Sequence, residues 1–276
     1  MKTIQQLRAI ATQRRIDLLT MIHDAGGGHS GGSLSCADIL VALHYAVMRL
    51  DPQQPLWPNR DRFILSKGHS VEGYYAILAD LGFFPKEELK TYCRYGSRLI
   101  GHPSVKVPGV EMNTGALGHG LPVAVGMALA ARMDSLDTQV YVLMGDGEQA
   151  EGSVWEAAMA AANYKLENLT AIVDRNRLQI SGCTEDVMAL ESLSGKWAAF
   201  GWDVREVDGH DMAALLQVFQ SPPQRGKPKL VLANTMKGCG VSYMQNVAKW
   251  HHGVPNGEEY EQAICELNAC LEEVGE

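Results

Sequence analysis

The chain lacks every cysteine arrangement that marks a zinc site. Its 276 residues include six cysteines, and none of them forms a CxxC pair. Scattered single cysteines in a chain of this length are typical of proteins kept in a reducing compartment. The sequence therefore gives no support to a zinc-dependent function, and we expect a cytoplasmic location.

Long apolar runs and an excess of basic residues are missing as well. No apolar run approaches the roughly 20 residues needed to span a bilayer. Charged residues interrupt the N-terminal segment, which also has no small-residue cleavage site for a signal peptide. The formal net charge is −8. Nucleic acids and anionic membranes require a basic face, so neither is an expected partner.

What the chain does contain is an alternation of apolar strands and helices. Short strand-like runs rich in apolar residues lie at 62–66, 139–144 and 169–174, and two more strand candidates lie at 202–207 and 229–234. Helical periodicity appears at 4–23, 71–82, 123–132 and 151–164. Apolar strands separated by helices indicate a mostly parallel sheet with helices on both faces. We predict a single doubly wound α/β domain over residues 1–276, with an acidic amphipathic helix at about 258–274.

A glycine-dense segment follows the first predicted helix. Five of the seven residues from Gly26 to Gly32 are glycine. Glycine is unfavourable in helices and strands, so this segment is predicted to be a turn. Ser35 is then expected to cap the next helix, with Asp38 in its first turn, where a carboxylate suits the helix dipole.

Two oxygen-bearing side chains follow neighbouring strands of the predicted sheet. Asp146 comes directly after the run at 139–144, and Asn176 follows the run at 169–174. Ligands bind at the carboxyl edge of parallel strands, where these two side chains are expected to meet. One carboxylate and one amide oxygen suit Mg²⁺, which completes its shell with phosphate oxygens and water. Gly145 and Gly147 allow close approach of a diphosphate to the N–H groups of the turn.

Five further motifs occur in order along the chain. They are Gly28-His29-Ser30-Gly31-Gly32-Ser33, Ser66-Lys67-Gly68-His69, Gly101-His102-Pro103, Thr114-Gly115-Ala116-Leu117-Gly118 and His252-Gly253-Val254-Pro255. Together with the Gly145-Asp146-Gly147 turn and Asn176, they resemble motifs of the transketolase family of thiamine diphosphate enzymes. The resemblance extends from about residue 10 to residue 255.

The resemblance implies a cofactor, a metal ion and roles for individual residues. It implies that Mg²⁺ is held by Asp146, Asn176 and the backbone carbonyl of Leu178. The implied thiamine diphosphate-binding residues are His69, Gly115, Leu117, Asp146, Gly147, Glu148, Asn176 and His252. The implied catalytic residues are His29, His69, His102 and His252, which would bind sugar hydroxyls or transfer protons near neutral pH. A lone histidine in a loop is more often solvated, and His251 competes with His252 for the last role.

Two positions depart from the family pattern, and half of a transketolase has no counterpart in this chain. Ser30 stands where proline is usual, and His119 stands where glutamine is common, which is expected to alter the pocket lining. The resemblance implies a separate C-terminal subunit that binds the cofactor's pyrimidine, a heterotetrameric assembly and sugar phosphate substrates.

Other functions are compatible with parts of the pattern. One alternative is another thiamine diphosphate enzyme, such as a deoxyxylulose-phosphate synthase or the alpha chain of a 2-oxo acid dehydrogenase. The second alternative is a non-catalytic subunit that only binds the cofactor. A dinucleotide-binding module is disfavoured, because the glycine-rich segment at 26–32 follows a helix rather than a strand.

Overall fold

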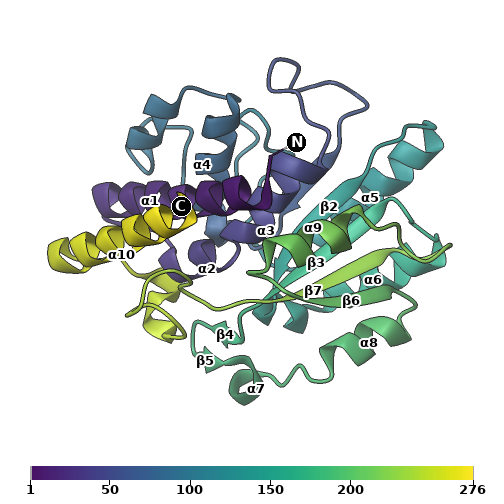
Figure 1. Ribbon diagram of the computed structural model, residues 1–276. Coiled ribbons are helices and arrows are strands. Elements are labelled where there is room, and N and C mark those ends of the chain that lie inside the picture. Colours follow the sequence, from purple (N-terminus) through teal and green to yellow (C-terminus); the bar gives the residue numbers. More distant parts are fainter. Residues whose placement is uncertain (1, 276) are drawn as a thin grey trace.

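The computed structural model describes residues 2–275 and has a five-stranded parallel sheet at its centre (Figure 1). The strands in spatial order are β1 (Arg62–Leu65), β2 (Val140–Gly145), β3 (Leu169–Arg175), β7 (Lys229–Asn234) and β6 (Asp203–Asp208). Every neighbouring pair in this sheet is parallel. A short antiparallel hairpin, β4 (Leu178–Gln179) and β5 (Gly182–Cys183), lies beside it. The predicted α/β fold class is confirmed.

Alternate residues of each strand face two separate cores. In β2, Tyr141 and Leu143 belong to one core, whereas Val142 and Met144 belong to the other. The first core is closed by α1 (Ile4–Ala25), α3 (Ala37–Ala42), α4 (Val71–Leu81) and α9 (Met212–Gln220). The second is closed by α5 (Gly120–Met133), α6 (Gly152–Asn163) and α8 (Leu193–Ala199). Because side chains alternate along a strand, the central strands, which are buried on both faces, are mostly apolar. The edge strand β6 is partly exposed and carries Arg205 and Glu206.

The unit β2–α6–β3 sets the position of the predicted metal ligands. Its three elements begin and end within one or two residues of the predicted bounds. The parallel register pairs Gly145 with Asp174. The chain therefore leaves the two strands at the same level of the sheet, and Asp146 and Asn176 emerge at one edge.

The glycine-dense segment differs from its prediction. A helix, α2 (Ser30–Ser35), begins inside it and includes Gly31 and Gly32. Close packing explains this: a Cβ on Gly31 would lie 2.7 Å from the Trp250 carbonyl oxygen, and one on Gly32 would lie 2.8 Å from Ser70 Oγ. Tertiary contacts thus outweigh the low helix propensity of glycine.

The predicted cap of the following helix is also wrong. Cys36, not Ser35, precedes α3, and it makes no side-chain capping bond. The Ser35 hydroxyl instead donates to Asp174 Oδ2 at 2.6 Å, across to the end of β3. Asp38 does lie in the first turn of α3, as expected.

The C-terminal helix α10 (Gly257–Gly275) lies alongside α1 (Figure 1). Ala263 and Leu267 of α10 are buried in a small third core with α1 residues. The Tyr260 ring stacks on His23 at 4.1 Å, and its hydroxyl lies 2.9 Å from Thr20 Oγ1. The predicted helix is confirmed, and its apolar face packs on the domain. Among the described residues, no helix combines the length and hydropathy required to cross a membrane.

Candidate active site

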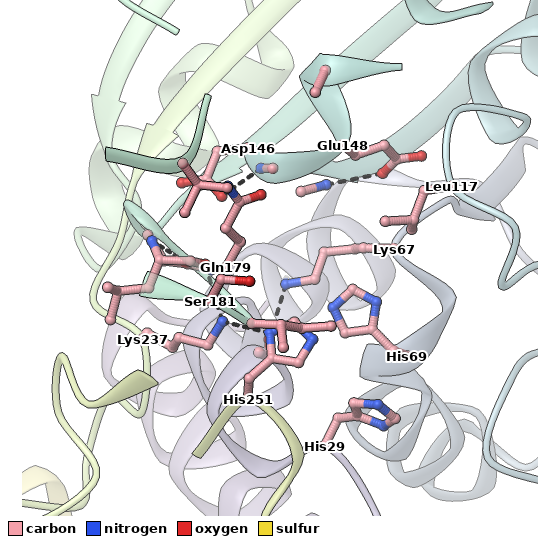
Figure 2. Close-up of a pocket in the computed structure, with 18 of the residues that line it drawn as sticks. His29, Lys67, His69, Leu117, Asp146, Glu148, Gln179, Ser181, Lys237 and His251 are labelled. Carbon is pink, nitrogen blue, oxygen red and sulfur yellow. Dashed lines mark hydrogen bonds between the residues drawn. The ribbon is translucent and has the colours of Figure 1, made fainter. Parts of the chain in front are cut away.

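A cavity of about 460 Å³ lies at the carboxyl edge of the sheet (Figure 2). All but one of the predicted site residues line it, namely His29, His69, His102, Gly115, Leu117, Asp146, Gly147, Glu148, Asn176 and Leu178. The exception is His252, whose neighbour His251 lines the cavity instead. Segments separated by more than 200 residues therefore meet at the edge that the strand order predicts.

The three predicted metal ligands belong to one small network. Asp146 Oδ1 accepts a hydrogen bond from Gly147 N at 2.8 Å, and Oδ2 accepts from Arg177 N at 2.5 Å. The second bond fixes the carboxylate against the loop that carries Asn176 and Leu178. The loops after β2 and β3 thus contribute a carboxylate, an amide oxygen and a carbonyl oxygen, and this donor set suits Mg²⁺.

Asp146 is a buried carboxylate, and one of its oxygens, Oδ2, lies 3.3 Å from Arg175 Nη1. Asp146 is only 2% exposed. Desolvation and the nearby charge of Asp174 raise the pKa of Asp146, although the N–H groups and Arg175 oppose that shift. A divalent cation at this point would stabilise the ionised carboxylate.

The amide of Asn176 is oriented by its neighbours. Its Nδ2 donates to Asp174 Oδ2 at 3.2 Å, and its Oδ1 accepts from Leu178 N, also at 3.2 Å. This pattern assigns the oxygen to the side of the Leu178 loop. Asp174 itself is occupied by a buried ion pair with Lys67, so it supports the site without being open to a metal.

Four histidine rings gather around that of His29. Their centroids lie 4.6 Å (His252), 5.3 Å (His69), 5.8 Å (His251) and 6.0 Å (His102) from that of His29. A parallel bridge between His29 and Gly253 brings the first and last of these segments together. The structure thus places both His251 and His252 in the cluster, His251 in the cavity lining and His252 against His29.

The cluster favours uncharged imidazoles. Burial, together with His252 and His102, lowers the pKa of His29 to about 4. Burial and Lys237 lower the pKa of His251 to about 3, and burial lowers the pKa of His69 well below its usual value. A neutral imidazole has one donor and one acceptor nitrogen, so these rings can both donate to and accept from hydroxyl groups. Within residues 2–275, Nδ1 of His29 is buried and has no hydrogen-bond partner.

Two glycines keep the walls of the cavity open. Gly115 has φ +142°, and a Cβ there would lie 2.8 Å from His102 Cδ2. A Cβ on Gly147 would lie 2.7 Å from Gln179 Oε1. A side chain at either position would displace a lining residue, so both positions suit a ligand that approaches the backbone closely.

Glu148 lines the cavity, but its carboxylate is already bound within the chain. It accepts hydrogen bonds from Ser66 Oγ, from Gly118 N at 2.8 Å and from Gly145 N at 3.1 Å. These donors belong to three different loops of the site. We therefore interpret Glu148 as a residue that holds those loops together, while its predicted contact with the cofactor stays a prediction.

The two departures from the family pattern have different settings. Ser30 is fully buried, and its hydroxyl donates to Gly253 O at 3.1 Å, which ties α2 to the loop of His252. His119 is exposed, and its Nδ1 lies 3.0 Å from the Leu117 carbonyl oxygen. Because His119 is not among the lining residues, the expectation that it alters the pocket lining is wrong for this chain.

Lys237 is a site residue that sequence reasoning missed. It follows β7 by three positions, is 2% exposed and lines the cavity. Its ammonium donates to the Leu178 carbonyl oxygen at 3.0 Å and lies 2.9 Å from His251 Nδ1. Because β7 was predicted, the rule that ligands bind after parallel strands would have pointed to this loop.

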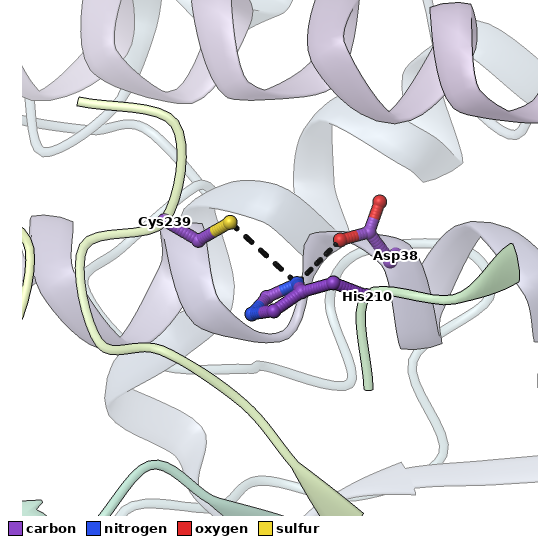
Figure 3. Close-up of side chains that lie close together, drawn as sticks. All are labelled: Asp38, His210 and Cys239. Atoms are coloured by element: carbon purple, nitrogen blue, oxygen red, sulfur yellow. Dashed lines mark hydrogen bonds and ion pairs between the residues drawn. The ribbon is translucent and has the colours of Figure 1, made fainter. Parts of the chain in front are cut away.

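A second polar cluster includes one side chain from the loop after β7 (Figure 3). It consists of Asp38, His210 and Cys239, whose potential ligand atoms lie within 4.8 Å of one another. Asp38 already pairs with Arg15, whose Nη2 is 2.6 Å from Oδ2. His210 Nε2 accepts from Met236 N at 2.9 Å, so the proton of the neutral ring is on Nδ1, which faces Asp38 at 2.8 Å. With that nitrogen protonated and Arg15 beside it, the cluster is unsuited to a metal ion.

Comparison with known proteins agrees with the geometry. Residues 5–267 match the family described as "Transketolase, thiamine diphosphate binding domain". The chain belongs to the transketolase family. It is 52% identical to a subunit of the apulose-4-phosphate transketolase of Phocaeicola vulgatus, over 98% of this chain and 97% of that protein. It is 44% identical to "6-deoxy-6-sulfo-D-fructose transketolase subunit SqwG" of a Clostridium species, over 90% and 91% of the two chains.

Solved transketolase structures share the fold. The enzyme from Campylobacter jejuni superposes with a TM-score of 0.90 at 30% identity, covering 97% of this chain and 43% of that one. The chain thus spans less than half the length of that transketolase, while it nearly matches the length of the relatives named as subunits. It is a transketolase-family subunit of the thiamine diphosphate-binding type, and the match does not support a 2-oxo acid dehydrogenase.

Proposed function

We propose that the chain is the diphosphate-binding subunit of a two-subunit transketolase. The enzyme would transfer a two-carbon ketol unit from a ketose phosphate to an aldose phosphate. One observation carries this proposal: Asp146, Asn176 and Leu178, which offer three oxygen atoms, line the same cavity as a group of histidines. The oxygens fit a Mg²⁺–diphosphate group, and the histidines fit a polyhydroxylated substrate.

The residues present suit thiamine diphosphate and Mg²⁺. Asp146, Asn176 and the Leu178 carbonyl would hold Mg²⁺, which in turn anchors the diphosphate. Gly147 lines the cavity, and a larger residue there would displace the Gln179 side chain. When bound, thiamine diphosphate supplies a nucleophilic thiazolium carbon and an electron sink for the transferred unit.

The histidines would position the substrate and transfer its protons. His29, His69, His102 and His252 come from four segments, and the other three rings have their centroids within 6.0 Å of that of His29. In their neutral form they can donate to a carbonyl or hydroxyl oxygen and accept a hydroxyl proton. Burial lowers the pKa of His29 and His69, so both rings are neutral at pH 7.

The partner and the substrate are proposed by analogy with relatives. Relatives that match this chain along almost their whole length are named as subunits of transketolases, which supports a separate second subunit. We propose that it binds the cofactor's pyrimidine ring, that two copies of each subunit form a heterotetramer, and that this assembly is cytoplasmic. One relative is named for a sugar phosphate and another for a sulfonated sugar, which supports a sugar with an anionic group as substrate.

Reconstitution with the partner tests the proposal. The chain would be mixed with a candidate C-terminal transketolase subunit, and ketol transfer between sugar phosphates measured with thiamine diphosphate and Mg²⁺. We expect activity from the mixture and none from either protein by itself. Turnover by this chain without a partner, or release of carbon dioxide from pyruvate in place of ketol transfer, would overturn the assignment. Cofactor binding without any turnover would support the non-catalytic alternative.

A further inference from the structure

The Lys237 ammonium lies between two acceptors that belong to different parts of the site. On one side it donates to the Leu178 carbonyl oxygen at 3.0 Å. On the other it is 2.9 Å from His251 Nδ1 (Figure 2). The other lysine of the lining, Lys67, pairs with Asp174, whereas no carboxylate pairs with Lys237 within residues 2–275. The charge of Lys237 is therefore buried and held by neutral groups alone.

The direction of the second hydrogen bond fixes the state of His251. An ammonium group has only donors, so Nδ1 of His251 must accept. The proton of the neutral ring is then on Nε2. His251 also stacks on His69, with ring centroids 5.0 Å apart and planes inclined by 29°. The stacking on His69 and the hydrogen bond from Lys237 restrict rotation of the His251 ring, and the ring holds the ammonium in place.

Lys237 occupies an atom that the metal requires. The Leu178 carbonyl is the third oxygen of the proposed Mg²⁺ site, and the ammonium is already bound to it. Two cations on one buried oxygen repel strongly, because little water is present to screen them. A diphosphate that arrives with the metal supplies enough negative charge to offset both cations.

We propose that Lys237 is a built-in competitor of the metal ion, and that His251 is the positioning residue that keeps it there. The proposal rests on the proposed function, since it concerns the same Mg²⁺–diphosphate site. Free Mg²⁺ then binds weakly, because it must displace the ammonium from Leu178 O. Mg²⁺ and the diphosphate load together, because the diphosphate accepts the displaced ammonium. Lys237 thus couples the binding of metal to the binding of cofactor.

The coupling is measurable without turnover. Binding of Mn²⁺, a paramagnetic substitute for Mg²⁺, would be followed by electron paramagnetic resonance on the full chain, with and without thiamine diphosphate. In Lys237→Met we expect Mn²⁺ alone to bind about tenfold more tightly, because the competing charge is gone. The gain in Mn²⁺ affinity on adding thiamine diphosphate should shrink. Lys237→Arg keeps a cation at this position and should keep weak binding of Mn²⁺ alone.

A matched variant separates this effect from general electrostatics. Lys249 precedes His251 by two positions, but its Nζ lies over the Trp250 ring, 4.9 Å from the centroid. Lys249→Met removes the same charge and should leave Mn²⁺ affinity unchanged. Equal effects of Lys249→Met and Lys237→Met would overturn the proposal, as would unchanged affinity for Mn²⁺ alone in Lys237→Met.

Variants of His251 test the positioning role. His251→Leu removes the acceptor and should raise the affinity for Mn²⁺ alone to a value between wild type and Lys237→Met. His251→Asn restores an acceptor oxygen and should restore weak binding. If His251→Leu and His251→Asn behave alike, His251 does not position the ammonium. Failure of this proposal would leave Mg²⁺-dependent cofactor binding and ketol transfer intact, whereas failure of the proposed function would remove them from the wild-type subunit pair.

Discussion

Two polar clusters include residues of the loop after β7, and only one of them lines a cavity. The cluster of Asp38, His210 and Cys239 has its charges paired, since Asp38 binds Arg15 and His210 accepts from Met236 N. The cluster at the carboxyl edge faces a cavity and retains an unpartnered His29 Nδ1 among the described residues. Both contain a histidine and a carboxylate, so residue type alone does not distinguish them.

The difference lies in what completes each cluster. Buried polar groups are costly unless they are hydrogen-bonded, so a stable fold satisfies nearly all of them. In the Asp38 cluster, side chains and backbone of the same chain do so. In the cavity cluster, His29 Nδ1 has no such partner among the described residues. The first cluster is therefore expected to contribute to stability and the second to binding.

The largest expected effect is on binding at the open cluster. Asp146→Ala removes the carboxylate ligand and should weaken Mg²⁺-dependent binding of thiamine diphosphate by at least about 100-fold. The apo chain should stay folded, because Arg175, which pairs with Asp146, keeps its ion pairs with Glu185 and Glu191. Titration calorimetry gives the affinity, and circular dichroism checks the fold. Unchanged affinity would remove the basis of the site assignment.

The reciprocal variant should affect stability at the closed cluster. Asp38→Ala leaves the buried guanidinium of Arg15 unpaired, which should cost about 3–5 kcal/mol of unfolding free energy. Urea denaturation measures this loss. Affinity for thiamine diphosphate in the folded fraction should change far less than in Asp146→Ala. A variant as stable as wild type would show that the cluster is not structural.

The pH dependence of stability should distinguish the clusters as well. Burial lowers the pKa of His69 well below its usual value, so the unfolded chain binds this proton at a higher pH than the folded chain does. Stability is then fully present above about pH 6.5 and is lost as the pH falls below that value. His69→Gln should lose less stability between pH 7 and pH 5 than wild type, as measured by urea midpoints. Equal losses in the two proteins would show that His69 is not held neutral.

The smallest expected effects concern glycines. Gly115→Ala places a Cβ on a residue with φ +142° and presses it against His102. The substitution should therefore lower the free energy of unfolding by roughly 1–3 kcal/mol. Gly126→Ala has open space around it in the middle of α5 and should stabilise by up to about 1 kcal/mol. Thermal melts of the two variants compare them directly. Opposite signs are expected, and a stabilised Gly115→Ala would contradict the strained geometry at that position.

Much of the fold and part of the site follow from sequence, for physical reasons. The apolar runs of β2 and β3 bound a helix, so the chain order alone predicts that Asp146 and Asn176 emerge together. The glycine-rich helix α2 was not predictable, because its stability depends on packing against Trp250 from far along the chain.

The contacts of Lys237 were also hidden in the sequence. They join the loop after β7 to the Leu178 carbonyl and to His251, and none of these partners is a sequence neighbour. The roles of His251 and Glu148 depend in the same way on loop geometry. The motifs predict where along the chain the site residues lie. Which of two neighbouring residues lines the cavity, and which bonds within the chain, depends on the three-dimensional structure.

The position of the bound metal tests the central claim most directly. Crystals of the subunit pair grown with Mn²⁺ and thiamine diphosphate would give an anomalous difference map at the manganese edge. We predict one peak per subunit of this type, about 2.1–2.3 Å from oxygens of Asp146, Asn176 and the Leu178 carbonyl. A peak at the Asp38 cluster, or a diphosphate bound with no metal between it and Asp146, would contradict the account.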